Sequence, residues 1–293
     1  MPAYPPVRKA VFPVAGFGTR FLPVTKSIPK EMLPIVDKPL IQYAVEEACE
    51  AGVESIIFVT NHQKRAIVEH FRADEELQSA LLAQGKRDLY QKVRSIIPDR
   101  VDVQYVIQER ALGLGHAVLC AREAVGDEAF AVLLADDLIR SSGAGCLAQM
   151  VGEYQATGRG VIGVEVIPTA MTGSYGIVSV QEDAGRSVIR GIVEKPAPAE
   201  APSNLGVVGR YILPPEVFPL LEVVRAGVGG EIQLTDAIAA LLETQPMMAY
   251  AFEGRRYDCG SRQGFVRATL DYAMGDAGLR ADLSAQIRKL GEG

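Results

Sequence analysis

The first half of the chain alternates between short apolar runs and longer amphipathic segments, and this alternation limits the fold more than any other feature. Short apolar runs predict buried strands, and apolar residues repeated along one face predict helices. The expected strands are Val11–Val14, Ile56–Thr60, Val103–Ile107 and Phe130–Leu134, and the expected helices are Lys38–Glu50, His62–Phe71, Asp74–Gln84 and Gly115–Val125. Because strands that alternate with helices form right-handed βαβ units, the sequence predicts an α/β fold with a mostly parallel central sheet flanked by helices.

Beyond residue 160 the pattern changes to β-rich segments separated by clusters of Gly, Pro and Asp. The expected strands are Val161–Ile167, Tyr175–Val180, Val188–Val193 and Gly206–Leu213. Such segments predict antiparallel strands that are added to the parallel sheet and cover one of its sides. The last part is expected to contain a helix Glu231–Glu243 that starts after Gly229 and Gly230, a strand Met247–Phe252, and helices over residues 262–290.

The charge distribution indicates a small anionic ligand rather than a polymer. The 293 residues carry a net charge of −6, which argues against a nucleic-acid-binding protein because such proteins have a strong basic excess. Between Arg8 and Lys38, however, six basic residues stand against two acidic ones. A compact basic region in an acidic chain is typical of a site for a small anion.

Two further features concern the surroundings of the protein. No apolar run is long enough to span a membrane, and the N-terminus has no apolar signal core with a cleavage site, so a cytoplasmic protein is expected. The dispersed cysteines predict buried free thiols rather than a metal knuckle or a disulfide framework. They are Cys49, Cys120, Cys146 and Cys259.

The segment directly after the first expected strand carries chemistry for phosphate. Residues 15–20 read Ala-Gly-Phe-Gly-Thr-Arg, and glycines let backbone N–H groups approach phosphate oxygens. Arg20 adds a forked cation and Lys30 a mobile one. Phe21 stands where a dinucleotide fingerprint needs its third glycine, and no Gly-Lys-Ser/Thr follows Gly16 at the Walker distance. The loop therefore fits a triphosphate by another route, or it is a glycine turn with solvated charges.

Acidic residues follow two of the expected strands. Asp136 comes directly after a buried strand, where a carboxylate needs a partner or a cation, and Asp258 precedes a Gly turn. Together they could hold a hard divalent ion. A turn or helix-capping role for Asp136 is the alternative, and Asp137 could take its place as the ligand. The three histidines form no zinc pattern, and no nucleophile elbow is present.

Nine short motifs, in order along the chain, resemble the bacterial UTP–glucose-1-phosphate uridylyltransferases (UDP-glucose pyrophosphorylases) of the sugar-phosphate nucleotidyltransferase family. They lie within residues 9–265 and together are very specific. The motifs are Gly16-Phe17-Gly18-Thr19-Arg20, Pro29-Lys30-Glu31-Met32-Leu33-Pro34, Gln108 with Gly113-Leu114-Gly115-His116-Ala117, Asp136, Tyr175-Gly176, Val193-Glu194-Lys195-Pro196, Pro202-Ser203-Asn204 with Val208-Gly209-Arg210-Tyr211, Glu231-Ile232-Gln233-Leu234-Thr235-Asp236-Ala237-Ile238, and Asp258-Cys259-Gly260.

The resemblance implies a Rossmann-like nucleotidyltransferase fold with a small added β-rich sugar-binding region and C-terminal helices. The catalytic domain is then expected over residues 1–265, with a nucleotide half over about 1–140 and a sugar-phosphate half over about 141–265. Residues 266–293 would form a C-terminal helical segment. The implied reaction joins UTP and α-D-glucose 1-phosphate to give UDP-glucose and pyrophosphate.

The resemblance also implies roles for single residues. Arg20 and Lys30 would neutralise the departing phosphates, and Lys195 would hold the glucose phosphate. The implied nucleotide contacts are Ala15, Gly16, Gly18, Thr19, Glu31, Gln108 and Gly113, with Glu31 and Gln108 as uracil readers. The implied sugar contacts are Tyr175, Gly176, Glu194, Lys195, Asn204 and Val207. Asp136 and Asp258 would bind Mg²⁺, and a homodimer or homotetramer is expected. No nucleic acid or membrane is an expected partner.

The sequence departs from the family pattern at Ala135-Asp136-Asp137, where Pro commonly precedes a single Asp. This puts the local turn and the identity of the metal ligand in question. Three other functions are alternatives: a thymidylyltransferase of the same fold, a glycosyltransferase that consumes a nucleotide sugar, and a non-catalytic nucleotide-sugar sensor. A glycosyltransferase has no need for a loop that grips pyrophosphate, and the intact charged residues argue against a sensor.

Overall fold

A mixed sheet forms the centre of the computed structural model, which describes residues 4–227 and 230–291. Within these residues the sheet has nine strands in the order β5-β4-β1-β6-β11-β8-β12-β10-β9. Their bounds are Asp102–Ile107, Ser55–Thr60, Lys9–Pro13, Phe130–Leu133, Leu205–Leu213, Val161–Val166, Met248–Ala251, Arg186–Glu194 and Gly176–Asp183. Only β11 and β10 among these described strands run against the others, so the mostly parallel sheet is confirmed.

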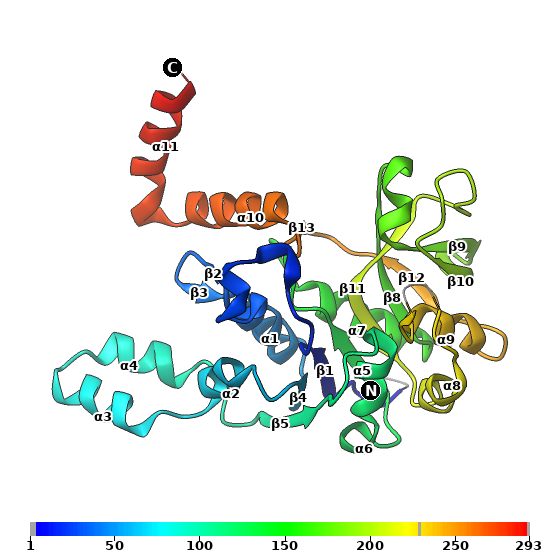
Figure 1. Ribbon diagram of the computed structural model, residues 1–293, viewed down its shortest axis with the longest axis horizontal. Helices are drawn as coiled ribbons and strands as arrows, with labels where there is room; N and C mark the ends of the chain where they lie inside the picture. Colours follow the sequence, from blue (N-terminus) through cyan, green and yellow to red (C-terminus); the bar gives the residue numbers. More distant parts are fainter. Residues whose placement is uncertain (1–3, 228–229, 292–293) are drawn as a thin grey trace.

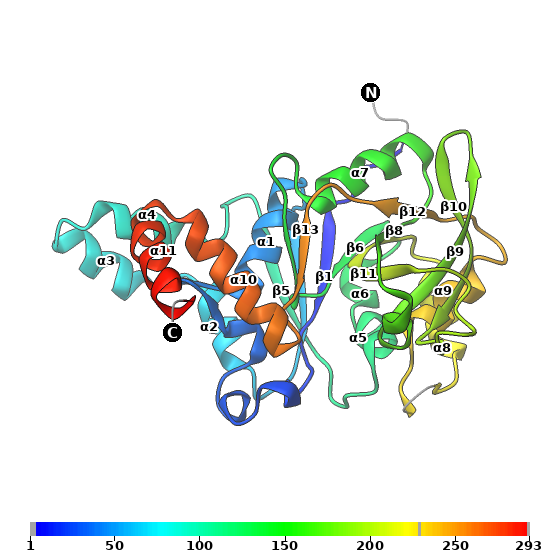
Figure 2. The ribbon, with the colours of Figure 1, turned by 90° about the horizontal axis from the view of Figure 1, so that it is seen from above.

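Helices cover both faces of the sheet because the strands alternate apolar residues between the two sides. In β1, Ala10 and Phe12 belong to the core under α1 and α7, whereas Val11 belongs to the core under α5, α8 and α9. Figure 2 shows α1 and α7 on one side of the strands and α5 and α8 on the other. These helices span Leu40–Glu50, Cys146–Thr157, Leu114–Cys120, Val217–Val223 and Leu234–Leu241. Two buried faces explain why the central strands read as continuous apolar runs.

The β-rich segments extend the sheet, and the expectation that they would cover one of its sides is wrong. β11 pairs antiparallel with β6 and continues the sheet toward β8, β12 and β10. The faces are already occupied by helices, so the added strands satisfy their backbone groups at the sheet edge. β9 then turns back and pairs with the start of β11, through Leu205 with Val178 and Gly206 with Ile177.

Most expected helices are present, with shifted ends. Lys38 and Pro39 form a short strand, β3, paired with β2 (Pro34–Ile35), so α1 begins two residues later than expected. The segment expected as one helix over 115–125 is divided into α5 and α6 (Arg122–Val125). The helix expected at 231 begins at Leu234, and its expected start at Gly229 lies outside the described residues.

Several elements had no expectation from the sequence. They are α4 (Arg87–Arg94), α7, α8, and the paired strands β7 (Asp137–Arg140) and β13 (Arg255–Asp258). α4 has no buried residue and therefore lacks the apolar face that a periodic pattern needs. Figures 1 and 2 show α4 beside α3 (Glu75–Ala83), beyond α2 (Arg65–Phe71) and away from the centre of the sheet.

Two helices end the chain. α10 (Arg262–Gly275) packs beside β13 and contributes Ala268 to a small core with Leu40, Leu138 and Tyr257. α11 (Ala277–Gly291) has no buried residue in the described chain and contacts α10, as Figures 1 and 2 show. The domain boundary expected between residues 265 and 266 falls inside α10.

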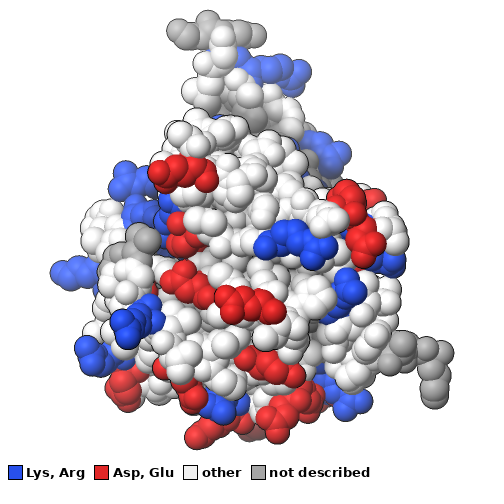
Figure 3. All heavy atoms as spheres, turned by 90° about the vertical axis from the view of Figure 1, so that its right-hand side faces the viewer, with Lys and Arg blue, Asp and Glu red and all other residues white. Residues whose placement is uncertain are grey.

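The surface carries charges of both signs. On the face shown in Figure 3, Asp and Glu side chains gather across the middle and lower part, with Lys and Arg around them. This face offers no continuous basic surface for a polyanion. No helix within residues 4–227 and 230–291 combines the length and apolar character needed to cross a bilayer.

Candidate active site

A cavity of about 380 Å³ lies between the ends of β6, β7, β9, β10, β11 and β13 and the start of α9. It contains charged and polar side chains from both halves of the sheet. Its lining includes Arg20, Asp136, Asp137, Tyr175, Gly176, Glu194, Lys195, Val207, Thr235, Arg256 and Asp258. Most of these residues were expected from the sequence to form one site, although the first and last of them are more than 200 positions apart.

The glycine loop leaves the carboxyl end of β1 and turns back within a few residues. Gly18 has φ 65°, a conformation that glycine adopts without strain. Its carbonyl accepts a hydrogen bond from Thr25 Oγ1 at 2.8 Å, and a side chain at Gly18 would meet the Lys30 side chain at 3.1 Å. The space beside Gly16 is open to 4 Å. The loop therefore presents backbone toward solvent beside Lys30.

Lys30 and Asp136 form a half-buried ion pair across the mouth of the site, with Nζ 2.6 Å from Oδ2. Burial by itself lowers the pKa of Lys30, but Asp136 and then Glu31 outweigh burial, so the pKa lies above its usual value. Burial raises the pKa of Asp136, and the Lys30 ammonium more than compensates, so this pKa lies below its usual value. Both groups are therefore charged at neutral pH.

Two carboxylates and one guanidinium converge beside Gly260. A side-chain carbon placed on Gly260 would lie 2.9 Å from Asp136 Oδ2, 3.0 Å from Asp258 Oδ1 and 3.2 Å from Arg20 Nη1. The Arg20 Nη1 also donates to the Gly260 carbonyl at 3.3 Å. A larger residue at 260 would fill the space between these groups, so glycine keeps it open. The two expected metal ligands and Arg20 are thus neighbours in space.

The donor set beside Gly260 fits a hard divalent cation that is also held by phosphate. Mg²⁺ usually takes one or two protein carboxylates and completes its shell with phosphate oxygens and water. Asp136 and Asp258 supply two, and no cluster of three or more His, Cys, Asp or Glu suited to a metal occurs in the described part of the chain. An ion bound here would therefore depend on the substrate for further ligands.

Asp137 faces away from that space and is fully engaged elsewhere. Its Oδ1 accepts from Arg256 Nε at 2.6 Å, and its Oδ2 accepts from the Gly209 backbone N–H at 2.7 Å. Only 7% of Asp137 is exposed. Of the two adjacent carboxylates, Asp136 is therefore the one placed to bind a cation.

The opposite wall of the cavity carries a carboxylate and an ammonium group from adjacent residues. Glu194 Oε1 lies 3.0 Å from Lys195 Nζ, and Glu194 Oε2 accepts from Thr235 Oγ1 at 3.0 Å. A side chain on Gly176 would meet Thr235 at 3.0 Å and Glu194 Oε2 at 3.5 Å. Val207 lies beside them. Four of the expected sugar contacts are therefore grouped around the Glu194 carboxylate.

The remaining two expected sugar contacts, Tyr175 and Asn204, differ in their position relative to the cavity. Tyr175 lines the cavity, and its hydroxyl lies 3.3 Å from Arg256 Nη1. Asn204 is exposed and is absent from the cavity lining. Its carbonyl accepts from the Ile167 N–H at 3.0 Å, so its backbone joins β8 and β11.

The expected base contacts lie at the other end of the glycine loop. Gln108 is buried at the end of β5, and its Nε2 lies 2.8 Å from His116 Nδ1 and 3.4 Å from the Gly113 carbonyl. Gly113 has φ 104° and packs against Ile232, so no larger residue fits there. The Ala15 carbonyl accepts from Asn61 Nδ2 at 2.9 Å. Gln108 and Gly113 thus lie together in the segment that follows β5.

Glu31 forms a buried ion pair that the sequence did not predict. Its Oε2 accepts from Lys64 Nζ at 2.8 Å, and Glu31 is only 1% exposed. Burial raises the pKa of Glu31 and lowers that of Lys64, and the attraction between them opposes both shifts. Because one carboxylate oxygen is committed to Lys64, Glu31 has limited freedom to contact a ligand.

A second buried pair supports the acidic loop from behind. Arg210, which is 0% exposed, donates to both carboxylate oxygens of Glu47 at 2.8 and 3.1 Å. It also donates to the Leu134 carbonyl at 3.0 Å, while Glu47 accepts from the Leu147 N–H at 2.9 Å. These bonds join β11, α1 and the start of α7 to the residue two positions before Asp136.

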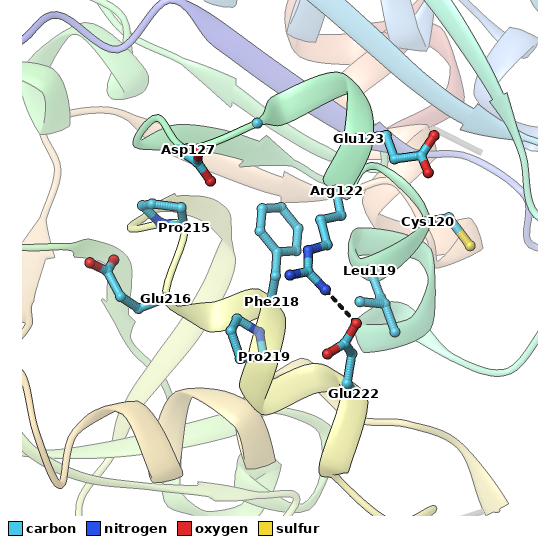
Figure 4. Close-up of a pocket in the computed structure, with 11 residues that line it drawn as sticks. Leu119, Cys120, Arg122, Glu123, Asp127, Pro215, Glu216, Phe218, Pro219 and Glu222 are labelled. Atoms are coloured by element: carbon cyan, nitrogen blue, oxygen red, sulfur yellow. Dashed lines mark hydrogen bonds and ion pairs between the residues drawn. The ribbon is translucent and has the colours of Figure 1, made fainter.

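A larger hollow, about 840 Å³, lies between α5, α6 and α8 (Figure 4). Figure 4 shows the Arg122 and Glu222 side chains paired across it. It opens at the far end of α5, through Leu119 and Cys120, whereas Leu114 at the start of α5 lines the smaller cavity. The convergent charges described above belong to the smaller cavity, which is therefore the candidate site.

Comparison with known proteins identifies the family of the chain. The model of the nucleotidyl transferase family matches residues 9–275. The chain belongs to that family. Members of the family generally use a divalent metal ion.

Relatives similar along their whole length share a single description. A UTP–glucose-1-phosphate uridylyltransferase of Bacillus subtilis (strain 168) is 51% identical over 278 residues, which cover 94% of each chain. A protein of the same description from Staphylococcus haemolyticus (strain JCSC1435) is 48% identical over 97% of this chain and 99% of its own.

Solved structures of similar proteins have the same fold. A UTP-bound UGPase from Acinetobacter baumannii has a TM-score of 0.88 and 45% identity, covering 97% of this chain and 99% of that one. A UDP-glucose pyrophosphorylase complexed with UDP-glucose has a TM-score of 0.84 and 43% identity, covering 92% of this chain and 100% of that one. The predicted family and fold class are therefore confirmed.

Three residues of the site were missed by reasoning from the sequence. Thr235 fixes Glu194, Lys64 fixes Glu31, and Arg256 links Asp137 to Glu165 and Tyr175, with Nη1 3.3 Å from each of the last two. Thr235 stood inside a recognised motif and could have been singled out. Lys64 and Arg256 carried no local signal, because each acts on a partner far away in the chain.

Proposed function

We propose that this chain transfers the uridylyl group of UTP to α-D-glucose 1-phosphate, which gives UDP-glucose and pyrophosphate. The relatives described as UTP–glucose-1-phosphate uridylyltransferases, and the similar structures that hold UTP and UDP-glucose, support the proposal. The single observation that carries it is the convergence of Asp136, Asp258 and Arg20 beside Gly260. That arrangement suits a triphosphate bound with a cation.

The reaction needs alignment and charge neutralisation rather than a protein nucleophile. An oxygen of the glucose 1-phosphate attacks the α-phosphorus of UTP, a new P–O bond forms, and the bond from the α-phosphorus to the bridging oxygen breaks, so pyrophosphate leaves with that electron pair. The attacking oxygen already carries negative charge, and no base has to remove a proton. Positioned cations are then the main source of catalysis.

Arg20 and Lys30 lie on the side of the leaving group in this proposal. Arg20 is held by the Gly260 carbonyl, which directs its guanidinium toward the space beside Asp136. Lys30 pairs with the Asp136 oxygen, Oδ2, that borders this space, and it is charged because of Asp136. The two cations would bind the phosphates that depart together.

Lys195 and Glu194 serve the sugar phosphate. The Lys195 ammonium would bind the phosphate of glucose 1-phosphate, and the Glu194 carboxylate, held by Thr235, would accept hydrogen bonds from sugar hydroxyls. Gly176 and Val207 would leave room for the sugar ring beside Glu194.

We assign the divalent ion as Mg²⁺, held by Asp136 and Asp258. When bound, it would supply positive charge that offsets the phosphate charge during transfer. Gln108, Ala15 and Gly113 are proposed to surround the uracil, with Glu31 acting through the loop that it anchors. The active unit is proposed to be a homodimer or homotetramer in the cytoplasm.

Pyrophosphate release tests the proposal directly. Purified protein is mixed with glucose 1-phosphate and Mg²⁺, and release is compared for UTP, dTTP, CTP and ATP, then for UTP without metal. We expect Mg²⁺-dependent release that is fastest with UTP. Faster release with dTTP would favour the thymidylyltransferase, and no release from folded protein with any nucleotide would favour the sensor.

A further inference from the structure

The Gln108 side chain points its amide nitrogen toward two neighbouring acceptors. A carbonyl oxygen can only accept hydrogen bonds, so the Gln108 atom that lies 3.4 Å from the Gly113 carbonyl must be the amide nitrogen, Nε2. The same Nε2 lies 2.8 Å from His116 Nδ1. With Nε2 as the donor, the His116 Nδ1 accepts from Gln108, and the proton of the neutral ring is on Nε2.

Both amide hydrogens of Gln108 thus have acceptors, and the Oε1 end remains for a ligand. No donor within residues 4–227 and 230–291 is found on Oε1. The shorter of the two contacts is the one to His116. The Gly113 carbonyl, at 3.4 Å, is a weak anchor by itself.

We propose that His116 is a positioning residue that makes the enzyme select a base with an N–H at position 3, and thereby favours uracil over cytosine. The inference rests on the proposed function, in which Gln108 reads the base. Uracil presents an N3–H donor, which an amide oxygen accepts. Cytosine presents an N3 lone pair, which an amide oxygen repels and an amide NH₂ would attract. By holding the NH₂ end, His116 keeps the oxygen end available for the base.

The surroundings of His116 favour the neutral ring that this arrangement needs. Burial and then the Arg110 charge keep the pKa of His116 below its usual value. His116 lies in the first turn of α5, and the Cys120 Sγ is its other side-chain contact, 3.8 Å from Nδ1. The helix begins directly after Gly113, and its first turn is held by the bond from the Gly115 N–H to the Ile232 carbonyl at 2.9 Å. Ring and amide are therefore held by a rigid segment.

The experiment measures kcat/KM for UTP, dTTP and CTP at saturating glucose 1-phosphate. His116→Leu removes the acceptor and keeps a similar volume, whereas His116→Asn can place an oxygen close to the position of Nδ1. Losing one hydrogen bond should lower the UTP to CTP ratio on the order of tenfold in the Leu variant. The Asn variant should recover most of that ratio. Thymine has the same N3–H as uracil, so the UTP to dTTP ratio should not change.

Cys120→Ala is the matched control, because it removes the other contact of His116 and leaves the acceptor in place. It should retain the wild-type UTP to CTP ratio. A double-mutant cycle with Gln108→Leu gives a second readout: if His116 acts through Gln108, adding His116→Leu to Gln108→Leu should not change the ratio further. If the Leu variant does not fold, His116→Ala, which also removes the acceptor, completes the cycle.

Equal loss of rate with UTP and CTP in His116→Leu would overturn the inference, since it indicates a structural role alone. A further drop of the ratio in the double variant would also overturn it. Failure of the proposed function is distinguishable from both results, because wild-type protein would then release no pyrophosphate with UTP.

Discussion

Replacing Lys195 tests whether the sugar phosphate and the nucleotide are bound by separate groups. In Lys195→Ala the phosphate loses one charge-assisted hydrogen bond, which is worth about 1.5 to 3 kcal/mol. That corresponds to about a 10- to 150-fold drop in kcat/KM for glucose 1-phosphate. Glu194 keeps its bond from Thr235, so the sugar pocket should stay in place. UTP affinity should be unchanged, because the convergent groups beside Gly260 are untouched.

The backbone conformation of Lys195 provides a matched control. Lys195 has φ 45°, in the left-handed region that costs a residue with a side chain about 1 to 2 kcal/mol. Lys195→Gly removes the same ammonium but tolerates that conformation. It should be as stable as Lys195→Ala, or more stable by up to about 1 kcal/mol. Both variants should lose activity equally if the charge is what matters.

The assay is pyrophosphate release titrated with glucose 1-phosphate at saturating UTP, together with calorimetric titration of UTP into each variant. The reasoning is refuted if UTP affinity falls as far as glucose 1-phosphate use does. It is also refuted if Lys195→Gly recovers the wild-type rate, because the backbone and not the ammonium would then be the important feature.

Three further outcomes are expected. Asp136→Asn should abolish pyrophosphate release at any Mg²⁺ concentration. Asp137→Asn should keep a Mg²⁺ response but lower stability, because the buried Arg256 guanidinium loses its counter-charge. A metal titration of both variants checks this. Glu47→Gln should cost about 3 to 5 kcal/mol of unfolding free energy, since it leaves Arg210 buried without its counter-charge, and a urea midpoint that does not move would contradict this. The pKa of Asp136 is lowered, so its pairing with Lys30 stabilises the fold above the unfolded-state value and is lost only below about pH 4; Asp136→Asn should unfold with less dependence on pH in that range.

The parallel half of the fold was predictable because its signals are local. β1, β4 and β6 are short apolar runs buried on both faces, and each stands where its run predicted. The half that contains the antiparallel strands was less predictable, since β11 pairs with three strands from distant parts of the chain. No local pattern tells a strand which edge it will join.

The site shows the same contrast between local and distant signals. Asp136 and Asp258 were proposed as neighbours from motifs, and the structure brings them together. Which of the two adjacent carboxylates faces the space beside Gly260 could not be inferred, because the answer depends on Arg256, 119 residues after Asp137. The burial of Glu31 likewise depends on Lys64, which lies on the next βα connection.

β11 has a mechanical consequence for the two halves of the site. One edge of this single strand pairs first with β9, at Leu205 and Gly206, and then with β6, from Arg210 to Leu213. The acidic residues follow β6, and Gly176, an expected sugar contact, begins β9. In the proposed function the two substrates would therefore be held along the same strand, and a hinge motion between the two halves would have to disrupt its pairing. Opening for substrates and release of products would then be left to the surrounding loops, and β11 would set the spacing between the two reacting phosphates.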